Sequence, residues 1–320
     1  MTPHLLQTQA WADLKSQFGW TTQFLQTERA SAQLLFRRLP LGLTIAYVPK
    51  GPTVDWSDLT ARQAILTQIH LTAKQNRAIF LKLEPDVWQN ESDESNEVVT
   101  LLTKSGFVPS DSIQPPGTAI VDISLPEDKI LAAMKQKTRY NIRLSGRKGV
   151  IVRHGSTDDL PLFQQLSKQT AERDDFGIHS LTYYQTAYNL FAPDHCALLI
   201  AEFEGQPLAA LMAFRQGQTA YYLYGASSNQ KRNLMPAYLI QWEAIRWGKQ
   251  HGCTAYDLWG IPNADATTLE AEFKQRYDGL WGVYRFKRGF GGQVRQSIGA
   301  FDYVYRPYLY RLYRLARRYR

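Results

Sequence analysis

Residues 236–260 read PAYLIQWEAIRWGKQHGCTAYDLWG, which predicts a helix, a stop and a strand in direct succession. Pro236 suits the first turn of a helix, and apolar residues follow it at helical spacing. Gly252 then ends the helix, and residues 255–258 form a strand that stops at Gly260. Asp257 stands near the end of this strand. It is either a site residue that binds substrate or a buried carboxylate satisfied by backbone amides.

The same plan occurs earlier in the chain. Residues 59–76 have the periodicity of an amphipathic helix, and the apolar residues 78–83 that follow form a strand ending at Glu84. A helix followed by a strand in both halves predicts two copies of one α/β unit. A length of 320 residues also fits two medium-sized domains. The loop around Gln114 to Gly117 marks a boundary near residues 110–126. Residues 118–123 form a strand there, and a capping box at Ser124 opens a helix that runs to about Arg147.

The composition excludes several classes of protein. Hydrophobic residues make up 44% of the chain and charged residues 21%, as in soluble globular proteins. No window approaches the ~20 apolar residues of a membrane span, and no apolar run follows Met1 as in a signal peptide. The two cysteines and six histidines form no metal-ligand spacing. We therefore expect a reduced, cytoplasmic protein without a metal.

A basic stripe lies on the helix that follows Ser124. Lys135, Arg139, Arg143 and Arg147 recur every four residues and so share one helical face. No acidic residue stands between Asp128 and Asp158 to balance them. A solvated surface helix would normally alternate the two signs of charge, so we predict that this stripe contacts phosphates, with a solvated face as the other interpretation.

A second basic cluster occupies residues 306–320. It contains arginines at 306, 311, 314, 317, 318 and 320, interleaved with tyrosines at 308, 310, 313 and 319. Three interpretations stay open: the tyrosines pack on a sheet, the segment contacts an anionic membrane surface, or it binds RNA. We prefer membrane contact combined with core packing.

Catalytic signatures are sparse. No Ser/His/Asp order, nucleophile elbow or Cys–His pair is present. Lys287 is the main candidate, because it lies in the phrase Phe-Lys-Arg-Gly-Phe-Gly-Gly (286–292), where glycines let the backbone approach closely. A coenzyme A transferase would place a glycine-rich turn before the helix at Pro236 to hold pyrophosphate. Asn233, Leu234 and Met235 stand there instead, which argues against that cofactor.

Several of these phrases, in this order, resemble the FemABX family, the aminoacyl-tRNA-dependent peptidyltransferases that build the interpeptide bridges of peptidoglycan. The similar segments are 137–143, 221–227, 236–248, 256–261 and 286–292. The resemblance implies an α/β fold of two tandem domains like GCN5-related N-acetyltransferases, with mixed sheets flanked by helices. Some members add a coiled-coil arm, for which this chain has no room. We place the first domain at 1–123 plus about 296–320, and the second at 124–295.

The resemblance also implies the reaction. An amine of the stem peptide or growing bridge attacks the ester of an aminoacyl-tRNA, and the acceptor is a peptidoglycan precursor such as lipid II or a UDP-muropeptide. No cofactor is needed besides aminoacyl-tRNA as co-substrate, because positioning and electrostatics can carry the rate. We expect a monomer that works in the cytoplasm, with peripheral contact at the inner face of the plasma membrane.

The family's transfer lysine corresponds to Lys287. We expect it to act as a fixed positive charge that either stabilises the oxyanion or holds the terminal phosphates of tRNA. Its alternative role is structural, as a buried partner of Asp257. Lys15, in the phrase 9–15, corresponds to a basic residue that binds the precursor diphosphate. The resemblance further implies that the stripe of Lys135, Arg139, Arg143 and Arg147 binds phosphates of tRNA or of the precursor. A second diphosphate-binding arginine of the family would fall near His179, where this chain has none, and Arg173 or His179 itself would have to replace it.

Three tyrosines, Tyr183, Tyr221 and Tyr224, are candidates for the walls of the peptide channel, with core packing as the other interpretation. Two further functions remain open from the sequence. One is an acyl-coenzyme A-dependent N-acyltransferase of the GCN5-related class acting on a polysaccharide or amino sugar. The other is a non-catalytic protein that binds RNA or membrane.

Overall fold

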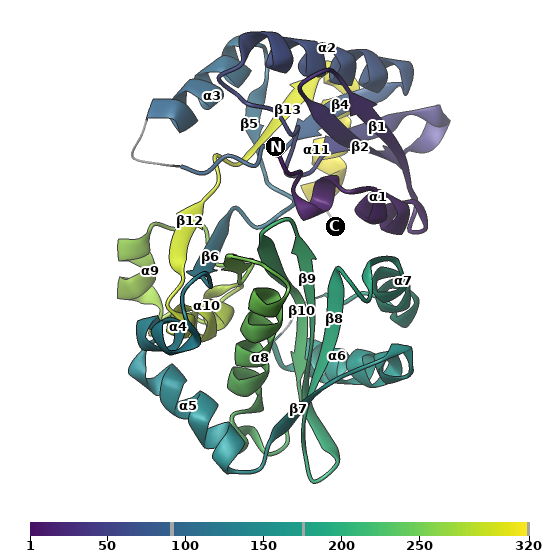
Figure 1. Ribbon diagram of the computed structural model, residues 1–320. Helices are drawn as coiled ribbons and strands as arrows, with labels where there is room; N and C mark the ends of the chain where they lie inside the picture. The colour runs from purple at the N-terminus through teal and green to yellow at the C-terminus, as the bar shows by residue number, and fades with distance from the viewer. Residues whose placement is uncertain (90–92, 175–176, 319–320) are drawn as a thin grey trace. The chain divides into compact units, whose positions relative to one another are not determined.

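The computed structural model describes residues 1–89, 93–174 and 177–318. The chain divides into two compact units, coloured by residue number in Figure 1. The first unit comprises Met1–Pro116 and Gln296–Arg320, and the second comprises Gly117–Arg295. Within the described residues, no helix combines the length and the apolar character needed to cross a bilayer.

The first unit is built on a six-stranded sheet in the order β1-β2-β3-β4-β13-β5. Strands β1 to β3 pair antiparallel, β3 and β4 pair parallel, and β13 is antiparallel to both β4 and β5. The strands are β1 (Trp20–Gln26), β2 (Ser31–Arg38), β3 (Thr44–Val48), β4 (Ala78–Leu83), β5 (Val108–Ser110) and β13 (Ala300–Val304). The helices are α1 (Gln9–Ser16), α2 (Leu59–Gln75), α3 (Asp93–Lys104) and α11 (Pro307–Arg318).

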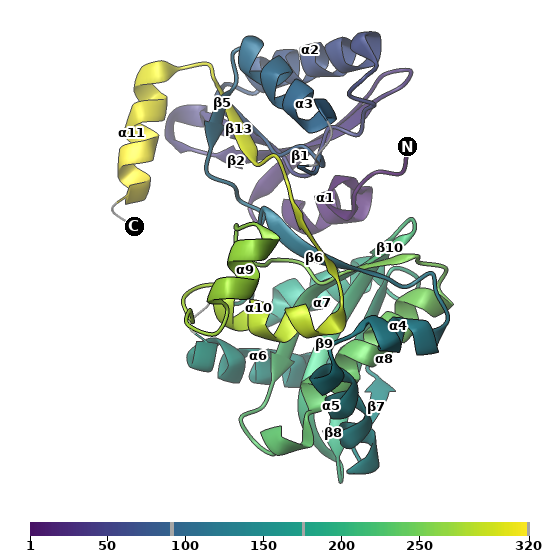
Figure 2. The same cartoon turned by 90° about the vertical axis from the view of Figure 1, so that its left-hand side faces the viewer.

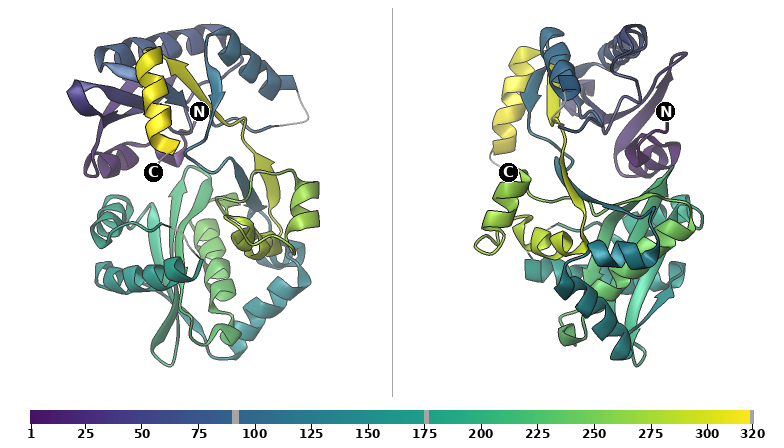
Figure 3. Two further views of the ribbon diagram at one scale, coloured as in Figure 1. Left: turned by 180° about the vertical axis from the view of Figure 1, so that it is seen from behind. Right: turned by 60° about the vertical axis from the view of Figure 1, so that its left-hand side comes forward.

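Both faces of this sheet are covered, which explains why all six residues of β4 are buried. Helix α2 buries Ile65, Ile69 and Ala73 in the larger core on one face. On the other face, α11 packs against Ile45, Ile79 and Phe80. Figures 2 and 3 show α11 running along the side of the sheet away from α2. Helices α2 and α11, which are distant in sequence, therefore cover opposite faces of one sheet.

The second unit contains a seven-stranded sheet in the order β12-β6-β11-β10-β9-β8-β7. Its strands are β6 (Gly117–Asp122), β7 (Ile151–His154), β8 (Cys196–Phe203), β9 (Gln206–Gln216), β10 (Thr219–Ser227), β11 (Ala255–Asp257) and β12 (Gln293–Gln296). Its helices are α4 (Glu127–Ala133), α5 (Gln136–Arg147), α6 (Leu160–Asp174), α7 (Leu181–Phe191), α8 (Pro236–Gln250), α9 (Ala266–Glu272) and α10 (Trp281–Lys287). Residues of α5 and α8 share the main core with alternate residues of β8, β9 and β11.

The predicted repeat is confirmed by the pairing of the strands. In the first unit, α2 connects the parallel strands β3 and β4. In the second, α8 connects the parallel strands β10 and β11. In each sheet, the strand that enters the crossover pairs antiparallel with the strand before it: β3 with β2, and β10 with β9. The strand that leaves the crossover pairs on its other side with an antiparallel strand from a distant part of the chain: β4 with β13, and β11 with β6. One α/β plan thus occurs twice.

The structure corrects three expectations about residues 118–147. Strand β6 hydrogen-bonds to β11, so it belongs to the second unit, and the boundary falls after Pro116 instead of at residue 123. The expected continuous helix is two helices, because Met134 is extended and the backbone N–H of Lys135 donates to the carbonyl of Gly289 (2.9 Å). The capping box at Ser124 does not form. Its hydroxyl donates to Asp122 (2.6 Å) instead, and no side chain caps α4.

A buried ion pair joins two neighbouring interior strands of the first sheet. The ammonium of Lys82 on β4 lies 2.8 Å from the carboxylate of Asp302 on β13, and both side chains are 5% exposed. Replacing Asp302 with alanine leaves a buried lysine without its counter-charge. We expect the free energy of unfolding to fall by about 3–5 kcal/mol, measured by chemical denaturation. The double variant Lys82→Met/Asp302→Leu should recover much of this loss, and equal losses in both variants would contradict the assignment.

Candidate active site

Lys287 is a buried lysine at the end of α10, with 5% of its surface exposed. Its Nζ donates to the backbone carbonyls of Trp259 (3.2 Å) and Gly260 (2.8 Å). The ring of Tyr222 lies below it, with its centroid 5.5 Å from Nζ. Two of the three N–H bonds of the ammonium are thereby fixed in direction by backbone and not by flexible side chains.

Asp257 shapes the turn that presents these carbonyls. Its Oδ1 accepts a hydrogen bond from the backbone N–H of Trp259 (2.7 Å) and one from the hydroxyl of Thr118. Trp259 has φ of 59°, the left-handed conformation that a bulky residue seldom adopts. Such strain persists only where neighbouring groups enforce it, and it is frequent at functional sites. Asp257 is therefore a buried carboxylate bound by backbone and hydroxyl, as one interpretation of the sequence held, and it positions the partners of Lys287.

Burial gives Lys287 an unusual acidity. Desolvation lowers its pKa to about 7, and the negative charge of Asp257 opposes that shift. The amine therefore exchanges between charged and neutral forms near neutral pH. This differs from the permanently charged group expected from the sequence.

Three glycines let the segment after Lys287 lie against neighbouring backbone. Gly291 has φ of 78°, and a Cβ there would lie 2.5 Å from the carbonyl oxygen of Ala133. A Cβ on Gly292 would lie 3.2 Å from the backbone of β6, and one on Gly289 would lie 2.2 Å from the hydroxyl of Thr138 on α5. The close approach anticipated from this phrase is present, and it holds the segment after Lys287 against α4, α5 and β6.

The three candidate tyrosines fall into two groups. Tyr221 pairs with Asp257 in the register of β10 and β11, and its ring meets that of Trp259 at 6.1 Å, so it belongs with the Lys287 group. The Tyr183 and Tyr224 hydroxyls instead lie 3.3 Å apart in a separate aromatic cluster. The register shift in β10 between residues 222 and 224 separates the two groups.

The aromatic cluster includes an exposed histidine. His179 stacks on Tyr183, with ring centroids 3.8 Å apart, and meets Tyr224 edge-on at 5.6 Å. Burial raises the pKa of Tyr183 to about 12, so its hydroxyl stays protonated at neutral pH. The cluster thus offers an aromatic wall with two neutral hydroxyls and one exposed imidazole. Arg173 is engaged elsewhere, with Asp174, Asn229 and the carbonyl of Ser227.

The basic stripe on α5 is smaller than predicted. The guanidinium of Arg139 turns back to the carbonyls of Ala132 (3.1 Å) and Met134, so it closes the end of α4. Lys135 lies at the N-cap of α5, while Arg143 and Arg147 remain exposed on the helix. Tyr140, which is 54% exposed, lies between Lys137 and Arg143 in sequence on the same helix. The exposed face is therefore basic with one aromatic ring.

Lys15 belongs to the first unit, on α1. Its Nζ lies 4.5 Å from the ring centroid of Trp11, one helical turn earlier, and burial lowers its pKa to about 8. Lys15 is thus a half-buried lysine whose charge, like that of the buried Lys287, is sensitive to its surroundings.

The turn before α8 lacks the geometry of a coenzyme A cradle. Residues Arg232–Leu234 form a 3-10 turn, and Lys231 and Met235 on either side of it have φ of 47° and 57°. Leu234 packs on the main core, so side chains occupy the place where glycine amides would hold pyrophosphate.

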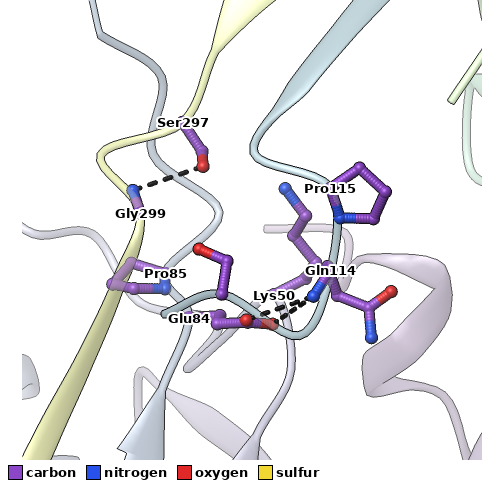
Figure 4. A pocket seen from close by; sticks show the side chains of 8 residues that line it. Lys50, Glu84, Pro85, Gln114, Pro115, Ser297 and Gly299 are labelled. Carbon is purple, nitrogen blue, oxygen red and sulfur yellow. Dashed lines mark hydrogen bonds between the residues drawn. The ribbon is translucent and has the colours of Figure 1, made fainter. Parts of the chain in front are cut away.

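A shallow pocket in the first unit, shown in Figure 4, is a structural junction. Buried Glu84 accepts hydrogen bonds from the hydroxyl of Tyr47 and from the backbone N–H groups of Ile113 and Gln114. Lys50 lies over the ring of Trp88 at 4.6 Å. These contacts tie the loop before residue 117 to the end of β4.

Comparison with known proteins places the chain in a family. The model of the FemAB family matches residues 1–206 and 202–318, which is nearly all of the sequence. The chain belongs to the FemAB family. It is 27% identical to the lipid II:glycine glycyltransferase of Staphylococcus epidermidis, over 96% of this chain and 89% of that protein.

Solved structures confirm the fold. The crystal structure of FemX superposes with a TM-score of 0.85 at 24% identity, over 97% of this chain and 94% of FemX. A tandem GNAT protein from the clavulanic acid biosynthesis pathway superposes with a TM-score of 0.52 at 10% identity, over 92% and 93%. The expected fold of two acetyltransferase-like domains is therefore correct. Among the described residues the longest helix is α2, with 17 residues, and no helical arm is present there.

Three groups at the site escaped the sequence analysis. The backbone carbonyls of Trp259 and Gly260 carry no side-chain signal at all, and Thr118 lies 139 positions before its partner Asp257. Tyr222 was indistinguishable from its tyrosine neighbours, because the register shift in β10 decides which of them faces Lys287. The run Leu-Trp-Gly (258–260) after an aspartate at a strand end is the signal that could have indicated an unusual turn.

The depressed pKa of Lys287 predicts a pH-dependent stability. Because the folded lysine titrates near 7 and the unfolded one near 10.5, the unfolded state binds more protons between these values, and stability rises with pH there. From pH about 7.5 to about 9, the free energy of unfolding should rise by about 2 kcal/mol more in the wild type than in Lys287→Met. Denaturation curves at both pH values measure this. An equal pH dependence in the two proteins would show that Lys287 titrates normally.

Proposed function

We propose that this protein transfers an aminoacyl group from aminoacyl-tRNA to an amine on the peptide of lipid II during peptidoglycan synthesis. Membership of the FemAB family and the 27% identity to a lipid II:glycine glycyltransferase support this reaction class. The single observation that carries the site assignment is the buried Lys287, held by two carbonyls in a strained turn. The transfer takes place at the inner face of the membrane, where a lipid-linked precursor and cytoplasmic tRNA meet.

The transfer requires little acid–base chemistry. The neutral acceptor amine attacks the ester carbonyl carbon, and a tetrahedral intermediate with an oxyanion forms. The bond from that carbon to the ribose oxygen then breaks, an amide forms, and the amine's proton goes to the departing tRNA hydroxyl. Because the ester is already activated, orientation and stabilisation of the oxyanion supply the acceleration.

Lys287 is suited to stabilise that oxyanion. Two of its N–H bonds are directed at Trp259 and Gly260, so the remaining N–H has a defined direction. Its burial removes competing water, which strengthens its interaction with a developing negative charge. An anion bound beside it would favour the charged form and raise its pKa, so the amine becomes most cationic when the intermediate forms.

The other candidate residues bind the two substrates. Lys15 contacts the diphosphate of the precursor. On α5, Lys135, Arg143 and Arg147 contact phosphates of tRNA. Tyr183 and Tyr224 line the path of the peptide, with Tyr221 nearer to the reaction centre.

Replacing Lys287 with methionine tests its role. Methionine fills a similar volume without the N–H donor, so we expect kcat to fall by about 10²–10³-fold while tRNA and precursor binding persist. Transfer is measured with charged tRNA and lipid II, by the mass gained by the product. Tyr277→Phe, on an exposed residue, is a control that should keep full activity. A Lys287→Met enzyme with unchanged turnover would remove Lys287 from the mechanism.

The pH profile distinguishes a cation from a base. If the protonated form of Lys287 is active, the ratio of kcat/KM between wild type and Lys287→Arg should decline as pH rises above about 7, because arginine stays charged. Taking this ratio cancels the ionisation of the acceptor amine. A ratio that increases with pH would instead identify Lys287 as a general base.

Calorimetry tests the alternative, an acyl-coenzyme A-dependent reaction. The occupied turn before α8 predicts no measurable heat when acetyl-coenzyme A is titrated into the protein. A tandem acetyltransferase that binds this cofactor serves as the positive control. Saturable binding would favour the N-acyltransferase function.

A further inference from the structure

Helix α11 is fixed to the first unit by one of its faces. Leu309, Tyr310 and Tyr313 pack against the sheet residues Ile45, Ile79 and Phe80. The hydroxyl of Tyr310 also donates to Asp302 (2.8 Å), the carboxylate that pairs with Lys82. This bond to a buried ion pair determines which side of the helix faces outward.

The outward side carries a second apolar stripe. Tyr308 is 82% exposed, Leu312 61% and Leu315 50%. Their spacing of four and three residues places them on one helical face, and the inward residues lie on the opposite side. Exposed apolar residues are ordinary when isolated, but three in a row on one helix form a surface that water solvates poorly.

Positive charge borders this stripe. Arg311 and Arg314 are exposed beside it on the helix, and Arg306 precedes the helix. No aspartate or glutamate follows Asp302 in the sequence. The outward face is therefore apolar along its centre and exclusively cationic at its edge.

We propose that this face of α11 docks on an anionic phospholipid surface. Tyr308, Leu312 and Leu315 would enter the boundary between headgroups and acyl chains, and Arg311 and Arg314 would contact lipid phosphates, as in interfacial amphipathic helices. This contact is independent of the transfer chemistry, although it would bring the enzyme to a membrane-borne acceptor.

Two other occupants fit the surface less well. A second copy of the chain docking by the same face would bring arginines against arginines without an acidic partner. RNA would neutralise the arginines but leave the two leucines exposed to water. An anionic membrane satisfies both the charge and the apolar stripe.

Flotation of the full-length protein with vesicles tests the proposal. We expect binding to vesicles of phosphatidylcholine with phosphatidylglycerol, and much weaker binding to phosphatidylcholine alone. Arg311→Gln/Arg314→Gln should lower the partition coefficient roughly thirtyfold, from about 1 kcal/mol for each arginine. Leu312→Ser/Leu315→Ser should lower it about tenfold or more. Phe24→Ser, at a 50% exposed residue on β1, is the matched control that should bind like wild type.

Each alternative has its own result. Equal binding to both kinds of vesicle, or unchanged binding in the α11 variants, would overturn the proposal. If the wild-type protein does not bind vesicles, two other results would identify another occupant and overturn the proposal. One is self-association that the Leu312/Leu315 variant abolishes, and the other is tRNA binding that the Arg311/Arg314 variant abolishes. The α11 variants should keep wild-type transfer to a water-soluble precursor without the lipid tail. A wild-type protein that floats with vesicles but transfers nothing would contradict the proposed enzyme and leave the docking surface standing.

Discussion

The buried amine of Lys287 needs polar partners, and this requirement fixes the conformation of several segments of the second unit. A buried amine must find partners or lose its proton, and Lys287 finds two carbonyls only because the chain turns through a left-handed residue at Trp259. That turn needs Asp257, which needs Thr118 from β6, while the segment after Lys287 needs glycines to fit against α4 and α5. Each of these contacts helps to form the buried environment that lowers the pKa of the amine.

The sequence predicted the architecture better than the geometry of the site. Helix and strand periodicity located α2, β4, α8 and β11 closely, because each has a regular apolar face and a clear stop signal. The sequence did not predict the break between α4 and α5. A backbone hydrogen bond from Lys135 to the distant Gly289 accompanies this break, and no local sequence pattern indicates such a bond. The prediction for Arg139 failed for the same reason. Its charge indicated a phosphate contact, but its guanidinium donates to the carbonyl of Ala132 at the end of α4.

The candidate residues illustrate the same limit. Lys287 was identifiable by its glycine-rich surroundings, but its acidity depends on burial and on distant carbonyls. The tyrosines of β10 were identifiable as a group, but a one-residue irregularity decides which ring lies under the lysine. Residue identity therefore predicts which chemistry is available, while register and burial decide which side chain performs it.

The place of β13 has a consequence for how the chain is made. This strand lies between β4 and β5 in the first sheet, yet it comes after the whole of the second unit in sequence. During synthesis on the ribosome, the second unit can complete its sheet while the first still lacks a central strand and the counter-charge of Lys82. The first unit thus completes its sheet last, and until then the edge of β4 lacks the partner strand that keeps it from pairing with other chains.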